Sequence, residues 1–249
     1  MRGPGRAVVV VGAAGGVGAS TLAALLAARW SADGRPVTLV DLDPGAGGIE
    51  VLLGIEAADG ARWPDLAGMR GPVAATELRG VLPRWGAVEV LGADRRGGPL
   101  DPAAVSAVWD GLVRGGGTVV ADLPARALGR EGLAALLGGP GGAGPAGGPW
   151  PIGAATTLVV TGQDVLGVGS AAVTCAALPV APRLVLRRRP GARVAPDQVA
   201  GTLGLPLLGL LPTDRRLAGA VDRGLGPVVA RWSGLSRAVV QIARGLGDG

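Results

Sequence analysis

The 249-residue chain contains no lysine, histidine, phenylalanine or tyrosine, and it has a single cysteine, Cys175. Without histidine, this thiol has no imidazole base to activate it, so thiol–imidazole catalysis is excluded. One cysteine cannot form a disulfide or a cysteine metal cluster within one chain, and we expect Cys175 to be a small buried hydrophobe. The chain therefore offers few general acids or bases, and its cysteine usage fits a reducing cytoplasm.

The chain also lacks long apolar segments. No uninterrupted apolar run approaches the roughly 20 residues that span a bilayer. An apolar run does follow Arg2 and Arg6, as in a secretory signal, but Gly12 and further closely spaced glycines interrupt it. We therefore expect a cytoplasmic protein.

The net charge is +5, and every basic residue is an arginine. These arginines are scattered along the chain rather than gathered in one stripe. The chain is also rich in glycine and alanine, a composition typical of GC-rich genomes. A basic composition of this kind gives little support for a nucleic-acid surface, and we do not expect DNA binding.

The sequence is organised around a glycine-rich stretch near its start. Residues 7–11 are apolar and mostly β-branched, which predicts a buried strand, and an Ala/Leu-rich segment from residue 20 predicts a helix. Closely spaced glycines between them let backbone N–H groups converge on a phosphate at the positive end of the helix dipole. The predicted nucleotide-binding residues are Gly15, Gly16, Val17, Gly18, Ala19, Ser20 and Thr21.

The stretch 15–21 resembles the deviant Walker A motif, KGGxGK[ST][ST], of the MinD/ParA family of P-loop proteins. In that family one lysine precedes the two glycines, and a second precedes the hydroxyl residues. Here those positions hold Ala14 and Ala19, so both lysines are missing. The resemblance implies an ATP/ADP site with Mg²⁺ in which nucleotide binding is weak or lost, and at most weak ATP hydrolysis.

Two aspartates follow the second predicted strand, residues 37–40. Asp41 and Asp43 would point the same way on an extended chain, at the strand end where parallel sheets bind ligands. Taken alone, they could simply end a strand and cap the next segment. Beside the glycine loop, residues 39–44 resemble the A′ motif of the MinD/ParA family. In that motif the aspartate before proline, here Asp43, orients the attacking water.

Residues 118–124 predict another apolar strand, which contains Asp122 near its end and has the form of a Walker B motif. The Asp122 carboxylate would hold Mg²⁺ through water, opposite the Ser20 hydroxyl. The predicted Mg²⁺ site comprises Ser20, Asp41 and Asp122.

Residues 60–66, Gly-Ala-Arg-Trp-Pro-Asp-Leu, point to one group within the MinD/ParA family. Together with residues 41–54 they resemble the actinobacterial CpaE-like group, which includes the septum-site-determining protein Ssd and is similar to the pilus-assembly proteins CpaE and TadZ. Trp63 has two interpretations, a core side chain closing a crevice between a helix and the sheet, or a partner-binding residue. We favour the core position.

Strand and helix patterns alternate through the rest of the chain. The alternation predicts an α/β fold with a mostly parallel, doubly wound sheet and helices on both faces. Residues 138–153 are rich in glycine and proline, and we expect a flexible insertion within a single P-loop domain spanning 1–249. Longer family members carry a receiver-like domain before the P-loop. We expect none here, because the first strand begins at about residue 7.

The last strands would border an adenine pocket, which the MinD/ParA family usually builds from an asparagine and a proline. The corresponding positions are Arg187 and Pro212, so the proline matches and the arginine would have to stack on the base. Residues 233–246 carry an apolar stripe that we expect to dock on the sheet. MinD-type members bind membranes through such a helix, so peripheral membrane contact at the septum or a pole is the alternative.

Three functions are consistent with this pattern. The first is a MinD/ParA-like positioning protein with a degenerate nucleotide site, acting with protein partners of the division machinery or of a pilus or secretion machinery. The second is an active ATPase switch that cycles between a monomer and a nucleotide-bound homodimer. The third, a P-loop biosynthetic ligase, needs substrate-handling acids and bases that are scarce in this chain. We favour the first.

Overall fold

The computed structural model describes residues 5–43, 48–93, 96–98, 100–128 and 155–247. Their strands form one eight-stranded sheet in the order β3-β4-β2-β5-β1-β6-β7-β8. Neighbouring strands are parallel except for the β3–β4 pair. The strands are β1 (Arg6–Gly12), β2 (Val37–Asp41), β3 (Arg84–Trp85), β4 (Val88–Leu91), β5 (Thr118–Pro124), β6 (Thr156–Gly162), β7 (Arg183–Arg187) and β8 (Leu207–Leu211).

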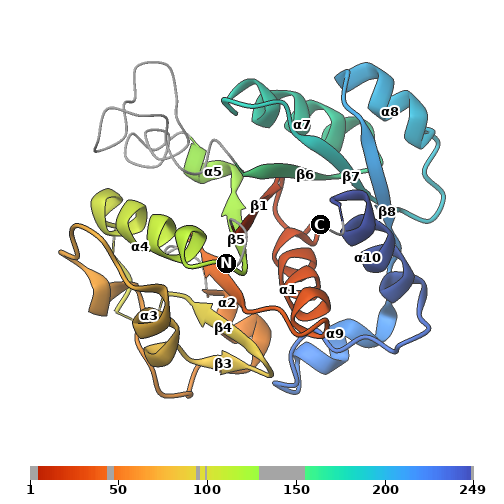
Figure 1. Cartoon of the computed structure of the whole chain (residues 1–249). Helices are drawn as coiled ribbons and strands as arrows, with labels where there is room; N and C mark the ends of the chain where they lie inside the picture. The colour runs from red at the N-terminus through yellow and green to blue at the C-terminus, as the bar shows by residue number, and fades with distance from the viewer. Residues whose placement is uncertain (1–4, 44–47, 94–95, 99, 129–154, 248–249) are drawn as a thin grey trace.

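Helices cover both faces of this sheet (Figure 1). The helices α1 (Ala19–Ser31) and α10 (Gly234–Gly245) pack on one face, and α4 (Pro102–Arg114) packs on the other. The other helical segments described are α2 (Gly48–Leu53), η1 (Trp63–Leu66), α3 (Ala75–Val81), α5 (Ala125–Leu128), α7 (Val165–Ala176), α8 (Pro196–Leu203) and α9 (Arg215–Val221). The predicted doubly wound α/β fold is confirmed.

The alternation of side chains along β1 explains the two-sided core. Val8 and Val10 pack with α1, whereas Val9 and Val11 pack with α4. Successive side chains of a strand point to opposite faces, so a central parallel strand has to be apolar on both. This packing holds β1 between β5 and β6, and it fixes the point from which the glycine loop leaves the sheet.

Some details go beyond the sequence prediction. β3 was not predicted, because two residues are too short for an alternation signal, and it pairs antiparallel with β4 at the edge of the sheet. Cys175, on α7, is half-buried against the core, and burial raises the pKa of its thiol. The predicted insertion at residues 138–153 lies outside the described residues.

The apolar stripe of α10 faces the protein itself. Leu235, Val239 and Ile242 are buried in the core that contains α1, and α10 packs along β8 and α1. The expected docking of the C-terminal helix on the sheet is confirmed, and the stripe considered for membrane contact is covered. Among the helices of the described ranges, none has the length and apolar character needed to cross a bilayer.

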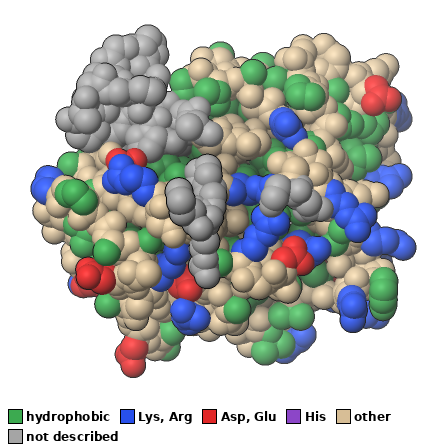
Figure 2. All heavy atoms as spheres, in the orientation of Figure 1, with side chains coloured by type: hydrophobic (Ala, Val, Ile, Leu, Met, Phe, Trp, Pro, Cys, Tyr) green, Lys and Arg blue, Asp and Glu red, His purple; other side chains and the backbone are tan. Residues whose placement is uncertain are grey.

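Arginines lie on several parts of the visible surface and are most numerous in its centre and right half (Figure 2). Figure 2 shows them distributed among hydrophobic and acidic side chains on one face of the molecule. Several are ion-paired with an aspartate, such as Arg70 with Asp101 and Arg96 with Asp65, at 2.8 and 2.7 Å. Pairs of this kind offset part of the positive charge.

Trp63 is a core residue and is 6% exposed. Its Nε1 donates a hydrogen bond to the backbone carbonyl of Asp41 at 2.7 Å. Its backbone N–H donates to the carbonyl of Gly92 at 3.1 Å. The core interpretation is confirmed, and this side chain ties the segment after α2 to the end of β2.

Replacing Trp63 with Phe tests this tie. The substitution keeps a buried ring but removes the N–H that donates to Asp41. We expect the free energy of unfolding, measured in urea, to fall by about 1–3 kcal/mol. The control is Trp232→Phe, since Trp232 is 79% exposed and its replacement should change stability little. Equal effects of the two substitutions would refute a stabilising role for the Trp63 hydrogen bond.

Candidate functional site

The loop between β1 and α1 forms an open cradle. Gly16 and Gly18 have φ values of 74° and 91°, in the left-handed region that favours glycine. A Cβ built on Gly15 or Gly16 would meet nothing within 4 Å, so this part of the loop is open to a ligand. Gly18 is the N-cap of α1, where backbone N–H groups and the helix dipole favour an anion. The loop therefore has the backbone geometry that phosphate binding requires.

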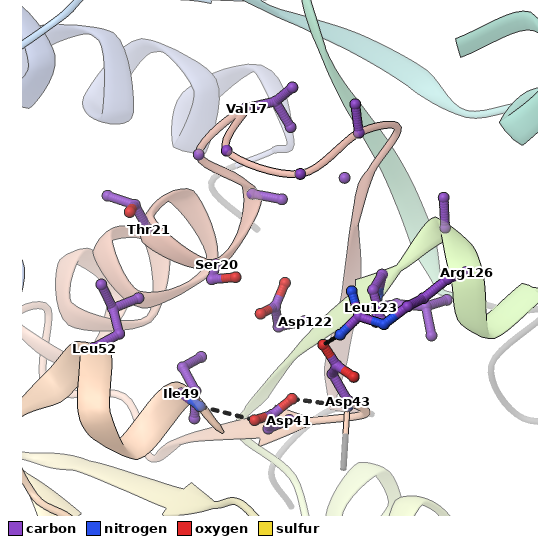
Figure 3. A pocket seen from close by; sticks show the side chains of 18 of the residues that line it. Val17, Ser20, Thr21, Asp41, Asp43, Ile49, Leu52, Asp122, Leu123 and Arg126 are labelled. Carbon is purple, nitrogen blue, oxygen red and sulfur yellow. Dashed lines mark hydrogen bonds and ion pairs between the residues drawn. The ribbon is translucent and has the colours of Figure 1, made fainter. Parts of the chain in front are cut away.

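A cavity of about 730 Å³ lies beside this loop (Figure 3). It opens at the carboxyl ends of β1, β2 and β5, the edge at which parallel α/β sheets bind ligands. The described residues that line it are those from Gly12 to Thr21 together with Asp41, Asp43, Gly48, Ile49, Val51, Leu52, Asp122, Leu123, Pro124, Ala125, Arg126 and Val221.

Two adjacent strands bring the acidic residues together. Asp41 on β2 is the register partner of Asp122 on β5. The Asp41 carboxylate accepts hydrogen bonds from the backbone N–H groups of Asp43 and Ile49, each at 2.8 Å. The Ser20 hydroxyl donates to Asp122. The three residues of the predicted Mg²⁺ site therefore border one cavity, with Asp43 beside them.

Burial makes the negative charge of these carboxylates costly. Burial raises the pKa of Asp41 to about 7; the backbone N–H of Ile49 opposes this shift, and the charge of Asp122 adds to it. The pKa of Asp122 is raised to about 6, again mainly by burial, while the hydrogen bond from Ser20 lowers it. A nearby cation would favour the ionised form of both side chains.

The donor atoms of the site fit Mg²⁺. Hydroxyl and carboxylate oxygens are the hard ligands that this ion prefers. The described part of the chain holds no group of three or more His, Cys, Asp or Glu side chains arranged around a metal position. Mg²⁺ commonly binds through one or two carboxylates and keeps waters or phosphate oxygens as its other ligands, which suits Ser20 and Asp122 with Asp41 beside them.

The two positions of the missing lysines differ in their surroundings. Ala14 is exposed on the loop, whereas Ala19 is buried at the first position of α1. Neither methyl group can carry charge to a phosphate. The residues of the loop itself therefore offer backbone N–H groups and the hydroxyls of Ser20 and Thr21, and none of them carries a cationic side chain.

Arg126 is a site residue that no sequence motif indicated. It lies on α5, directly after β5, and its guanidinium is ion-paired with the carboxylate of Asp43. Figure 3 shows its side chain extending toward Asp43, across the cavity from Ser20 and Thr21. The available signal was its position four residues after Asp122, which places it at the same edge of the sheet.

The predicted adenine-binding residues lie at this edge but outside the cavity lining. Arg187 ends β7, and a Cβ built on Gly18 would lie 3.6 Å from its Nη1. Pro212 follows β8 and lines a separate hollow of about 300 Å³, between the start of α9 and the start of α10. The structure thus brings Arg187 beside the glycine loop and leaves Pro212 apart from it.

A buried ion pair supports the acidic edge. Arg62 Nε lies 2.7 Å from Glu50 Oε1, and both side chains are almost completely buried. Glu50 belongs to α2 and is adjacent to Ile49, whose N–H donates to Asp41. Arg62 is adjacent to Trp63, which donates to the carbonyl of Asp41. The start of α2 therefore holds the side chain of Asp41, and the segment after α2 holds its backbone carbonyl.

The glycine loop lies between a central parallel strand and a helix, and the acidic ends of neighbouring strands lie beside it. This arrangement defines a P-loop-type nucleotide-binding domain. The family model described as the CobQ/CobB/MinD/ParA nucleotide binding domain matches residues 8–228. The chain belongs to this family.

Two curated relatives from strains of Mycobacterium tuberculosis, Uncharacterized protein MT3760 and Uncharacterized protein Rv3660c, are each 39% identical to this chain over 224 residues. The alignment covers 88% of this chain and 58% of each relative. The chain therefore spans little more than half the length of these relatives.

Solved structures with the same fold come from several organisms. The MinC:MinD cell division protein complex of Aquifex aeolicus gives a TM-score of 0.75 at 20% identity, covering 97% of this chain and 95% of that one. A ParA family ATPase of Chlorobium tepidum gives 0.75 at 18% identity, covering 96% and 98%. The septum site-determining protein MinD of Pyrococcus horikoshii, complexed with Mg-ADP, gives 0.61 at 18% identity, covering 98% and 96%. At these identities the likeness shows the fold.

The raised pKa of Asp122 predicts a pH-dependent stability. Folding raises this pKa from 3.8 to about 6, so the unfolded chain releases the proton at lower pH than the native protein. Ionised Asp122 therefore destabilises the native state increasingly between about pH 4 and 6, and fully above that.

Asp122→Asn removes this penalty and keeps an oxygen for Ser20. In Mg²⁺-free buffer, we expect the variant to be about 1–3 kcal/mol more stable than the unmodified protein at pH 8. The gain should shrink to nothing near pH 4, as measured by urea denaturation across pH. Asp59→Asn, at an exposed position, is the control and should show no gain. A stability difference for Asp122→Asn that does not change with pH would contradict the assignment.

Proposed function

We propose that this protein is a MinD/ParA-like spatial-regulation protein with a degenerate nucleotide site. It would position the division septum, or a pilus or secretion apparatus, through protein partners of that machinery. The observation that carries the proposal is the pair Ala14 and Ala19 at both lysine positions of an otherwise complete glycine loop. Support for a positioning role comes from the MinC:MinD cell division complex and the septum site-determining protein among the similar structures.

The finer group within the family is proposed from residues 60–66, which resemble the CpaE-like group that includes Ssd. This stretch carries Arg62 and Trp63, which join the chain after α2 to Glu50 and to the end of β2. The motif would therefore preserve the shape of the site independently of its catalytic power.

The residues present would still hold a nucleotide weakly. The backbone N–H groups of residues 15–19 would surround phosphate oxygens, and Ser20 with Asp122 would bind the accompanying Mg²⁺. Bound Mg²⁺ neutralises phosphate charge. Asp43 would orient a water if hydrolysis occurs, and its carboxylate is engaged by Arg126 in this structure. We infer a cytoplasmic protein whose function does not depend strongly on ATP.

The second candidate is an ATP-dependent dimerisation switch. It is favoured by the arrangement of Ser20, Asp41, Asp43 and Asp122 around one cavity, which retains the metal-binding and water-orienting positions of the resemblance. The argument against it is that Ala14 and Ala19 leave the negative charge of the transferred phosphate without the two lysines that would neutralise it. Loss of one cation from a phosphoryl-transfer site can cost about 10³–10⁵ in rate.

The two candidates predict different responses to Mg-ATP. We expect light scattering to give the same oligomeric state with and without Mg-ATP, because Ala14 cannot carry charge to a partner's phosphates. We also expect phosphate release to stay at background, because Ala14 and Ala19 neutralise no transition-state charge. The comparison variant, Ala14→Lys/Ala19→Lys, restores both cations and should gain measurable turnover.

The matched control adds Asp122→Asn to that double variant, which removes the proposed Mg²⁺ contact and should abolish the gained turnover. Steady hydrolysis with ATP-dependent dimerisation by the unmodified protein would contradict the scaffold and favour the switch.

A further inference from the structure

Arg126 is the only cation among the described residues that line the cavity. Its guanidinium is ion-paired with Asp43, and its side chain is 53% exposed whereas that of Asp43 is 14% exposed. Because α5 follows β5 directly, the backbone of Arg126 is positioned by the strand that also carries Asp122. Its side chain is largely exposed to solvent, whereas its backbone is fixed at the edge of the site.

The charges around the cavity are unbalanced. Asp41, Asp43 and Asp122 line it, and Arg126 is the one opposing side chain among the described lining residues. The phosphates of a nucleotide would add further negative charge to this edge. The field of Arg126 extends beyond its ion pair, since it lowers the pKa of Asp122 while Asp43 raises it.

We propose that Arg126 is the side chain that binds the phosphate groups of a nucleotide, in place of the cations missing at Ala14 and Ala19, and that Asp43 holds its guanidinium when no phosphate is bound. This inference rests on the nucleotide site of the proposed function. A guanidinium presents a planar fork of N–H donors that can bind either a carboxylate or a phosphate in a bidentate manner. Figure 3 shows the Arg126 side chain ending at Asp43, on the side of the cavity opposite the α1 residues Ser20 and Thr21.

Asp43 is then a competitor for the same guanidinium. A phosphate has to displace the Asp43 carboxylate from Arg126, so the ion pair lowers the apparent affinity for nucleotide. Asp43→Asn weakens this competition, because a neutral amide holds a guanidinium less strongly than a carboxylate does. We expect Asp43→Asn to bind Mg-ATP about tenfold more tightly than the unmodified protein.

A different role for Arg126 would be to mask the charge of Asp43 without touching phosphate. A double-mutant cycle separates the two roles. In both cases Arg126→Ala weakens Mg-ATP binding in the unmodified background, since it exposes the Asp43 carboxylate. Only direct phosphate binding predicts that Arg126→Ala still weakens binding, by about tenfold, when Asp43 is already Asn.

The experiment measures dissociation constants for Mg-ATP by calorimetry for Arg126→Ala, Asp43→Asn, the double variant and Arg126→Lys. Arg126→Lys should retain part of the affinity, because it keeps a charge but loses the planar fork. The matched control is Arg70→Ala. Arg70 is 57% exposed and paired with Asp101, neither residue lines the cavity, and the loss of Arg70 should leave the dissociation constant unchanged. Circular dichroism verifies that each variant is folded.

Two results would overturn the inference. One is an unchanged dissociation constant when Arg126→Ala is added to Asp43→Asn. The other is the absence of Mg-ATP binding by every variant, including Asp43→Asn. Neither result bears on the scaffold with a degenerate site, which is contradicted separately if the unmodified protein dimerises with ATP and hydrolyses it steadily.

Discussion

The concentration of negative charge at the carboxyl ends of β2 and β5 is the constraint on which the site depends. Parallel pairing sets Asp41 beside Asp122, and packing on both faces of the sheet buries these strand ends. Two backbone N–H groups stabilise the Asp41 carboxylate, and the Ser20 hydroxyl stabilises that of Asp122. These donors offset only part of the rise in pKa that burial causes, so the pKa of both aspartates stays raised. The site is thus built to receive positive charge.

The surrounding structure preserves this arrangement although the loop supplies no lysine. The buried pair of Arg62 and Glu50 fixes α2, and Trp63 fixes the end of β2. Removing one partner of a buried ion pair typically costs about 3–5 kcal/mol, so this support is expensive to lose. The chain keeps the shape of a nucleotide site and places an arginine against its acidic edge. The geometry of the P-loop is therefore present without the lysine charges that stabilise the transition state of phosphoryl transfer.

The parts of this arrangement that follow local patterns could be predicted from the sequence. Apolar runs predicted the central strands, and the glycines predicted the loop before α1. Asp41 was assigned to the Mg²⁺ site from its place at the end of a parallel strand, and Asp122 from the Walker B form of its strand. The pairing of Arg126 with Asp43 could not be predicted, since it depends on the direction of the chain after β5. The bond from Trp63 to the Asp41 carbonyl likewise depends on tertiary packing, and it leaves no periodic signal in the sequence.

The central claim is that the fold is intact and the site is deficient in positive charge. Calorimetric titration with Mg-ATP of the unmodified protein and of Ala19→Lys tests it most directly. Each charge-assisted contact is worth about 1.5–3 kcal/mol, a factor of about 10 to 100 in affinity. The account predicts weak or undetectable binding by the unmodified protein and a gain of that order in Ala19→Lys. A submicromolar dissociation constant for the unmodified protein, unchanged in Ala19→Lys, would contradict it.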